Sequence, residues 1–160
     1  MIVIVMGVAG SGKSTIGQLL ADRLGWPFYD GDDFHPIANV EKMRAGIPLT
    51  DEDRSDWLSA LAALITKQLR QDQSAVIACS ALKQHYRKKL NVNDEVHFVY
   101  LRGSYDQIAA RLHERTGHYM PPDLLASQFA ALEEPQDALT FDISQPPEQI
   151  VTEIVSRFHQ

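Results

Sequence analysis

The stretch Met1–Ser14, MIVIVMGVAGSGKS, decides the fold. It begins with a short β-branched apolar run, which is typical of a strand buried on both faces of a sheet. The next eight letters, GVAGSGKS, fit the pattern GxxxxGK[ST] of a phosphate-binding loop. TIGQLLADRL follows with apolar residues at helical spacing and stops at Gly25. Strand, loop and helix in this order are the context that the pattern requires, so we expect a nucleotide to bind here.

The residue types of this loop suit a triphosphate. Glycines let the backbone curl so that successive N–H groups point at phosphate oxygens, and the start of the following helix adds its positive dipole end. We expect Lys13 to reach the β- and γ-phosphates and the Ser14 hydroxyl to bind Mg²⁺. The predicted nucleotide-binding set is Gly7, Ala9, Gly10, Ser11, Gly12, Lys13, Ser14 and Thr15. The motif alone fits GTPase switches, motor ATPases, small kinases and non-catalytic nucleotide binders alike.

Strands and helices alternate along the rest of the chain. Further strands are expected at WPFYD, AVIAC, VHFVYL and LTFDI, and further helices at about residues 53–70, ALKQHYRKKL, 104–114, 123–132 and after QPPEQ. A short helix between them would be capped by Asn39 and ended by Gly46. This alternation predicts an α/β fold with a mostly parallel sheet, in a single domain over residues 1–160, and a ligand site beyond the carboxyl ends of the strands.

Composition narrows the range of functions. The chain has 160 residues and a formal net charge of −6, which argues against a nucleic-acid binder. Its N-terminal apolar run is too short to span a membrane and lacks the basic flank of a signal peptide. Cys79 is the only cysteine, so no internal disulfide can form and we expect a reduced, cytoplasmic protein. We interpret Cys79 itself as a buried strand residue rather than a nucleophile.

Three carboxylates crowd the stretch FYDGDDFHP, residues 28–36, just after the second predicted strand. Near a phosphate loop, such groups can hold Mg²⁺ or deprotonate an acceptor hydroxyl, whereas in isolation they would make an ordinary solvated turn. The third strand ends in Cys79 and Ser80, where many P-loop enzymes carry a metal-binding aspartate. We therefore assign Asp30 to the metal and Asp32 to the acceptor hydroxyl as general base, and give Asp33 no role.

Basic residues supply the complementary charge. Arg54 ends DEDR, Lys83 and Arg87 are four apart and are expected on one helical face, and Arg111 and Arg115 are also four apart. Lysines and arginines most often lie on exposed helix faces, where they pair with nearby acidic residues. Beside a transferred phosphoryl group, however, arginines would neutralise the negative charge that develops in the transition state. The following RTGHYMPP is either a plain loop or the hinge of a lid over about residues 112–126 that excludes water.

The chain resembles the gluconokinase family of small P-loop sugar-acid kinases, and the likeness runs from Gly7 to Pro135. The segments that carry it are GVAGSGKS, DGDDFHPIANVEKMRAGIPLTDEDR, WL, CSALKQHYR, YLRG, RLHERTGHYMPPDLLASQF and LEEP. It implies ATP- and Mg²⁺-dependent phosphorylation of the 6-hydroxyl of D-gluconate, giving 6-phospho-D-gluconate and ADP. It also implies a nucleoside-monophosphate-kinase-like fold with a five-stranded parallel core and a lid, and a homodimer.

The resemblance also implies roles for individual residues. Arg111 would lie against the adenine and Arg115 would contact the phosphates from the lid as a catalytic residue; His35, Arg54, Lys83 and Arg87 would line the acceptor pocket. Gluconate fits the residue types, because its carboxylate calls for Arg54 or Arg87 and its hydroxyls for Asp32, His35 and Ser80.

Asp56, Lys88 and Tyr119 depart from the proline, aspartate and phenylalanine usual in the family, and none of them removes a phosphate-binding group. Three other interpretations remain open. A shikimate-kinase-like enzyme leaves FHPIANVEKMRAGIPL unexplained, and a nucleoside monophosphate kinase needs a second base pocket. A non-catalytic ATP-binding protein has no use for the predicted base, metal ligands and lid arginines.

Overall fold

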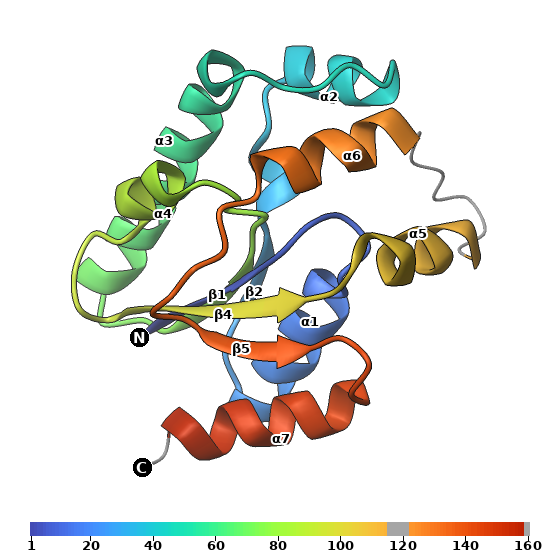
Figure 1. Cartoon of the computed structure of the whole chain (residues 1–160). Coiled ribbons are helices and arrows are strands. Elements are labelled where there is room, and N and C mark those ends of the chain that lie inside the picture. The colour runs from blue at the N-terminus through green and yellow to red at the C-terminus, as the bar shows by residue number, and fades with distance from the viewer. Residues whose placement is uncertain (115–121, 159–160) are drawn as a thin grey trace.

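A single parallel sheet of five strands forms the centre of the protein, in the order β2-β3-β1-β4-β5 (Figure 1). The computed structural model describes residues 1–114 and 122–158. The strands are β1 (Ile2–Met6), β2 (Phe28–Asp30), β3 (Ala75–Ala78), β4 (Val96–Arg102) and β5 (Leu139–Asp142). The predicted α/β fold with a five-stranded parallel core is confirmed. Because β1 pairs with both β3 and β4, it delivers the phosphate loop to the middle of the carboxyl edge.

Helices cover both faces of the sheet and its carboxyl edge. In chain order they are α1 (Lys13–Leu24), the 3₁₀ turn η1 (Gly31–Phe34), α2 (Ile37–Arg44), α3 (Asp51–Arg70), α4 (Gln84–Leu90), α5 (Tyr105–Glu114), α6 (Pro122–Ala131) and α7 (Pro147–Phe158). Figure 1 shows α1 and α7 on one face of the sheet and α3 and α4 on the other, with α5 directly after the end of β4.

The unbroken apolar run of β1 is explained by this two-sided cover. Val3 and Val5 pack in a core cluster with α1 and α7, while Ile2, Ile4 and Met6 pack in a second cluster with α3 and α4. All five side chains are fully buried. A strand with polar residues at alternate positions could not occupy this place, because neither face meets water.

Two helix starts differ from the sequence-based expectation. The helix α2 begins at Ile37, directly after Pro36, whose restricted φ suits a helix start. Asn39 is therefore not the cap of α2 but a buried residue within the helix. The helix α4 begins at Gln84, and Lys83 has an extended backbone, so the prediction that Lys83 and Arg87 share one helical face is wrong. Gly46 follows the end of α2 with a positive φ of 74°, as expected.

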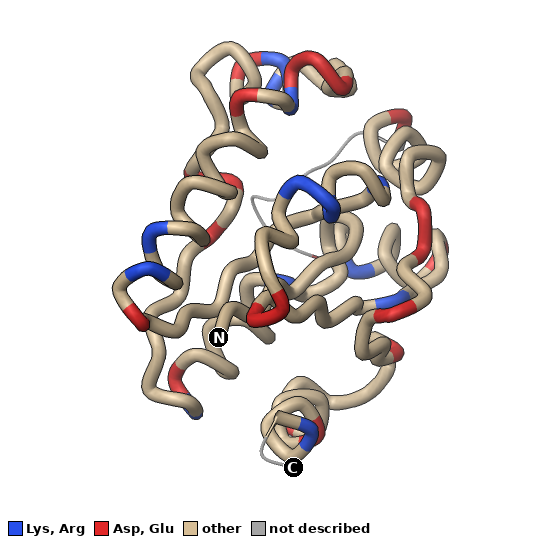
Figure 2. The backbone as a smooth tube through the Cα atoms, turned by 90° about the vertical axis from the view of Figure 1, so that its left-hand side faces the viewer, with Lys and Arg blue, Asp and Glu red and all other residues tan. Residues whose placement is uncertain are grey.

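Charge is distributed without a strong bias in position. Figure 2 shows Lys and Arg positions interspersed with Asp and Glu positions over the described chain. Positive charge at any anion site must therefore come from a few individually placed side chains. None of the helices within residues 1–114 and 122–158 is long and apolar enough to cross a membrane. Cys79 is buried behind the end of β3, and burial raises the pKa of its thiol to about 12.

Candidate active site

The phosphate loop connects β1 to α1 and has the backbone that its glycines permit. Gly10 and Gly12 have φ values of 81° and 98°, in the left-handed region that other residues rarely adopt. No side chain caps the first turn of α1, so its N-terminal amides remain available to an anion. Lys13 begins this helix, and its ammonium group donates to the carbonyl of Val8 at 3.0 Å.

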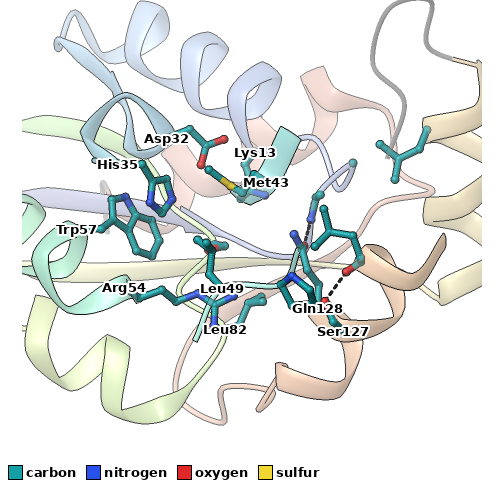
Figure 3. A pocket seen from close by; sticks show the side chains of 16 residues that line it. Lys13, Asp32, His35, Met43, Leu49, Arg54, Trp57, Leu82, Ser127 and Gln128 are labelled. Atoms are coloured by element: carbon teal, nitrogen blue, oxygen red, sulfur yellow. Dashed lines mark hydrogen bonds between the residues drawn. The ribbon is translucent and has the colours of Figure 1, made fainter. Parts of the chain in front are cut away.

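Two cavities flank this loop. The first, which we call the Lys13 pocket, has a volume of about 320 Å³ and includes Ala9, Gly10, Lys13, Asp32, His35, Arg54, Trp57 and Ser80 in its wall (Figure 3). The second, the Arg111 pocket, has a volume of about 330 Å³ and includes Ser11, Gly12, Thr15 and Arg111. Because the loop contributes residues to both walls, a chain of phosphates lying along it would reach from one cavity to the other.

The Arg111 pocket contains the residue predicted to lie against the adenine, beside residues of the phosphate loop. The guanidinium group of Arg111 donates to the carbonyl of Ile143, which fixes the side chain, and a methyl group added to Gly12 would lie only 3.7 Å from it. A fixed planar cation beside the phosphate loop suits stacking on an aromatic base. Arg115 and residues 115–121 of the predicted lid lie outside the described residues.

The carboxylate of Asp30 lies at the helix end of the phosphate loop. One of its oxygens accepts from the backbone of Asp32 at 3.0 Å, and the other accepts from the Ser14 hydroxyl at 3.2 Å. Hydroxyl and carboxylate oxygens are hard ligands of the kind that Mg²⁺ prefers. The described residues hold no cluster of three or more His, Cys, Asp or Glu for a metal. Ser14 and Asp30 therefore fit an ion that takes its other ligands from phosphates and water.

Gly31 fixes the position of this acidic stretch. It packs so closely on β3 that an added Cβ would come within 2.5 Å of the carbonyl oxygen of Ala78. Any side chain here would push the following carboxylates away from the sheet. The glycine of DGDD thus allows a turn that lies flat on the end of β3 and keeps the neighbouring carboxylates close to the sheet.

Asp32 and Lys13 lie at the same end of the Lys13 pocket (Figure 3). Asp32 is exposed to solvent although it lines the pocket. Burial by the surrounding protein nevertheless raises the pKa of its carboxyl, the charge of Lys13 lowers that pKa, and the charges of Asp30 and Asp33 raise it again. Asp33 does not line this pocket. A carboxylate with a raised pKa, facing a cavity beside the phosphate loop, has the properties of a general base.

His35 and Trp57 form one wall of the pocket as a stacked pair. Their ring centroids are 4.3 Å apart and their planes differ by 14°, and the indole nitrogen of Trp57 donates to the carbonyl of Gly31 at 2.7 Å. Burial, followed by the charge of Arg54, lowers the pKa of His35 to about 4. His35 is therefore neutral at physiological pH. In the sequence, Trp57 belongs to the apolar face of the helix predicted at about residues 53–70, and nothing there indicates its contact with Gly31.

The lowered pKa of His35 predicts a pH dependence of stability. The unfolded chain protonates this imidazole near its ordinary pKa of 6.5, and the folded protein only near 4. The stability that His35 provides is thus complete above about pH 6.5 and is lost as the pH falls from there toward about 4. We expect the urea unfolding midpoint to drop less between pH 7 and pH 5 in His35→Gln than in the unchanged protein. The exposed His113→Gln is the control, and equal drops in both variants would contradict this prediction.

Arg54 reaches the same pocket from the first turns of α3. Its guanidinium group donates to the Tyr86 hydroxyl at 2.9 Å, and that hydroxyl donates to the Asp51 carboxylate. Lys83 pairs with the same carboxylate at 2.8 Å and does not line the pocket. The hydrogen bond from Arg54 to Tyr86 therefore orients the guanidinium group toward the cavity, while Lys83 neutralises the charge of Asp51.

Arg87 lies outside the lining of the Lys13 pocket, and its guanidinium group binds backbone carbonyls. It is 8% exposed and donates to the carbonyls of Ala81, Leu82 and Glu133 at 2.7, 3.2 and 2.8 Å. These contacts tie the segment after β3 to the segment after α6. Of the two arginines predicted as a carboxylate clamp, Arg54 lines the pocket and Arg87 does not.

The helix α6 contributes two residues that the sequence did not indicate. Ser127 and Gln128 line the Lys13 pocket, and the backbone N–H of Ala9 donates to the side-chain oxygen of Gln128 at 2.7 Å. This bond fastens α6 to the phosphate loop. Both residues belong to the SQF of the segment that resembles the family, but this pattern does not predict a contact with the phosphate loop.

The phosphate loop contributes to a cavity that contains Arg111 and to a second cavity that contains Asp32. Such a loop can pass a phosphoryl group between two small molecules, which is the defining property of P-loop small-molecule kinases. The family model described as shikimate kinase matches residues 9–159. Within this class the chain belongs to the gluconokinase family, as the following similarities show.

The chain is 43% identical over 159 residues to the gluconokinase of Gluconobacter oxydans (strain 621H), covering 97% of this chain and 89% of the relative. It is also 43% identical over 159 residues to the thermoresistant gluconokinase of Escherichia coli (strain K12), with coverage of 96% and 91%. The crystal structure of a gluconokinase from Sinorhizobium meliloti 1021 matches with a TM-score of 0.87 at 43% identity, covering 96% of this chain and 89% of that one. The resemblance seen in the sequence is confirmed.

Proposed function

We propose that the protein transfers the γ-phosphoryl group of ATP to the 6-hydroxyl of D-gluconate, giving 6-phospho-D-gluconate and ADP. The observation that carries this proposal is the phosphate loop between the Lys13 and Arg111 pockets. Membership of the gluconokinase family supplies the acceptor. Adenine occupies the Arg111 pocket, the phosphates lie along the loop, and gluconate occupies the Lys13 pocket.

The residues of the phosphate loop and of the Lys13 pocket have distinct roles in the proposed transfer. Lys13 contacts the β- and γ-phosphate oxygens and stabilises the charge that develops on them. Asp32 accepts the proton of the 6-hydroxyl as its oxygen bonds to phosphorus. Arg54 binds the gluconate carboxylate, and Ser80 and His35 bind its hydroxyls. Ser14 and Asp30 hold Mg²⁺, which neutralises phosphate charge when bound.

The remaining assignments extend this proposal. Arg115 acts on the transferred group from a lid over about residues 112–126, by analogy with other phosphoryl-transfer enzymes that bring an arginine over the phosphates. The protein works in the cytoplasm as a homodimer. The roles of Arg115 and of the dimer rest on the family resemblance, and the cytoplasmic location rests on the single cysteine and the lack of a signal-peptide pattern.

An acceptor screen tests the proposed reaction. ADP release is measured with gluconate, related aldonates, shikimate and AMP as acceptors, with and without Mg²⁺. The expected result is turnover that requires gluconate and Mg²⁺. Faster ADP release with shikimate or AMP would show that gluconate is not the preferred acceptor. Tight ATP binding with no turnover on any acceptor would show that the protein is not a kinase.

We expect Arg54→Ala to raise KM for gluconate roughly 10- to 100-fold, because the substitution removes a charge-assisted hydrogen bond to the gluconate carboxylate. KM for ATP should change little. Tyr86→Phe is the matched control, because it removes the hydroxyl that orients Arg54 but keeps the guanidinium group. It should raise KM for gluconate less than Arg54→Ala does. Equal losses for gluconate and ATP in Arg54→Ala would point to a phosphate role or a folding defect instead.

A further inference from the structure

We propose that Asn39 holds His35 as the neutral tautomer with its proton on Nε2, so that His35 serves the Lys13 pocket as a hydrogen-bond donor and not as a base. Asn39 is a positioning residue in this arrangement. The identity of the bound oxygen, a hydroxyl or carboxylate oxygen of the sugar acid, rests on the proposed function, whereas the tautomer does not.

The first step is the orientation of the Asn39 amide. Asn39 is 3% exposed, and its amide group faces the carbonyl oxygen of Asp53 at 2.7 Å. A carbonyl oxygen can only accept a hydrogen bond, so the atom facing it must be the amide nitrogen. The side chain of Asp53 is itself held by Lys42 and by the backbone of Thr50, each at 2.9 Å, which keeps the start of α3 in place.

The second step follows from the second hydrogen on that nitrogen. The amide nitrogen itself lies 3.3 Å from Nδ1 of His35, within hydrogen-bond distance. An amide nitrogen has no acceptor capacity, so Nδ1 must provide the lone pair and cannot carry a proton. In a neutral imidazole the proton then resides on Nε2.

The third step concerns the charge and direction of the ring. Stacking on Trp57 fixes its plane, and Trp57 is fixed in turn by the carbonyl of Gly31. The charged groups that share the pocket wall with the ring are Lys13, Asp32 and Arg54. Burial and the positive charge of Arg54 both lower the pKa of His35, which keeps the ring neutral. With Nδ1 engaged by Asn39, Nε2–H is the polar group left for a ligand, and the task of base falls to Asp32.

Nuclear magnetic resonance tests the tautomer directly. A long-range ¹H–¹⁵N correlation spectrum of the full chain at pH 7 should show His35 with an unprotonated Nδ1 and a protonated Nε2. In Asn39→Asp, the new carboxylate should accept from Nδ1 and shift the proton there. A protonated Nδ1 in the unchanged protein would overturn the proposal, and this spectrum decides the matter even where Asn39→Asp does not fold.

Kinetics test the donor role separately. The amide nitrogen of Gln can replace Nε2 of the imidazole, whereas that of Asn can replace only Nδ1. We expect His35→Asn to raise KM for gluconate roughly tenfold and His35→Gln to raise it clearly less, with KM for ATP unaffected in both. Equal KM values for the two variants would overturn the donor role. Absence of any gluconate turnover in the unchanged protein would instead refute the proposed function and leave the tautomer measurement valid.

Discussion

Replacing Lys13 with alanine should reduce gluconate phosphorylation by roughly 10³-fold or more, below detection in an ordinary assay. Lys13 is at once the first residue of α1 and part of the wall of the Lys13 pocket, so its ammonium group lies where phosphate charge must accumulate. The cation acts in a partly enclosed cavity, where the attraction is stronger than in water. The measurement is ADP release with saturating gluconate and ATP, together with calorimetric ATP binding.

Lys67→Ala provides the control for this variant. Lys67 is exposed on α3 and contributes to neither the Lys13 pocket nor the Arg111 pocket, so its loss removes the same charge from the protein without touching the loop. It should retain the activity of the unchanged protein. Activity of Lys13→Ala within tenfold of that value would place the phosphate charge elsewhere and contradict the role of the loop.

Asp32→Asn should lower kcat by roughly 10²–10⁴-fold with a small effect on KM for ATP. The amide keeps the size and the hydrogen-bonding edge of the side chain but cannot accept the proton of the 6-hydroxyl. Asp32 is also the carboxylate of DGDD that faces the pocket beside Lys13. Steady-state rates with varied gluconate separate the loss of the base, which lowers kcat, from a loss of binding, which raises KM.

The neighbouring Asp33 makes this test unusually well controlled. Asp33→Asn removes the same charge one residue away, on a side chain that does not line the pocket. Its kcat should remain within about threefold of the unchanged protein, because only electrostatic effects at a distance are altered. Near-normal kcat in Asp32→Asn would transfer the role of base to Asp30 or reduce Asp32 to positioning.

What could be predicted from the sequence was local in the chain. The loop Gly7–Ser14 carries its own geometry, since its glycines, lysine and adjoining helix are contiguous. Asp30 and Asp32 were predicted to lie near it because the carboxyl ends of parallel strands meet at one edge. Arg54 was proposed as one of the basic residues that complement the carboxylates, the family resemblance placed both Arg54 and His35 at the acceptor, and both line the pocket.

What could not be predicted depends on contacts between distant segments. Trp57 binds the carbonyl of a residue 26 positions away, and Gln128 binds one 119 positions away, so no local pattern marks either as part of the site. The sequence offers Arg54 or Arg87 as the carboxylate clamp, because a sequence does not reveal whether a cation meets a substrate or a backbone carbonyl. The guanidinium group of Arg87 is engaged by three backbone carbonyls, one of them 46 positions along the chain.

The place of the phosphate loop between two separate cavities determines how the substrates meet. Under the proposed function each substrate has its own cavity, so both can be bound when the bond to phosphorus breaks. We then expect the phosphoryl group to pass directly from donor oxygen to acceptor oxygen, with no covalent intermediate on the protein. Under the proposed function we expect the kinetics of a ternary complex and inversion at phosphorus, because the attacking and leaving oxygens lie roughly in line.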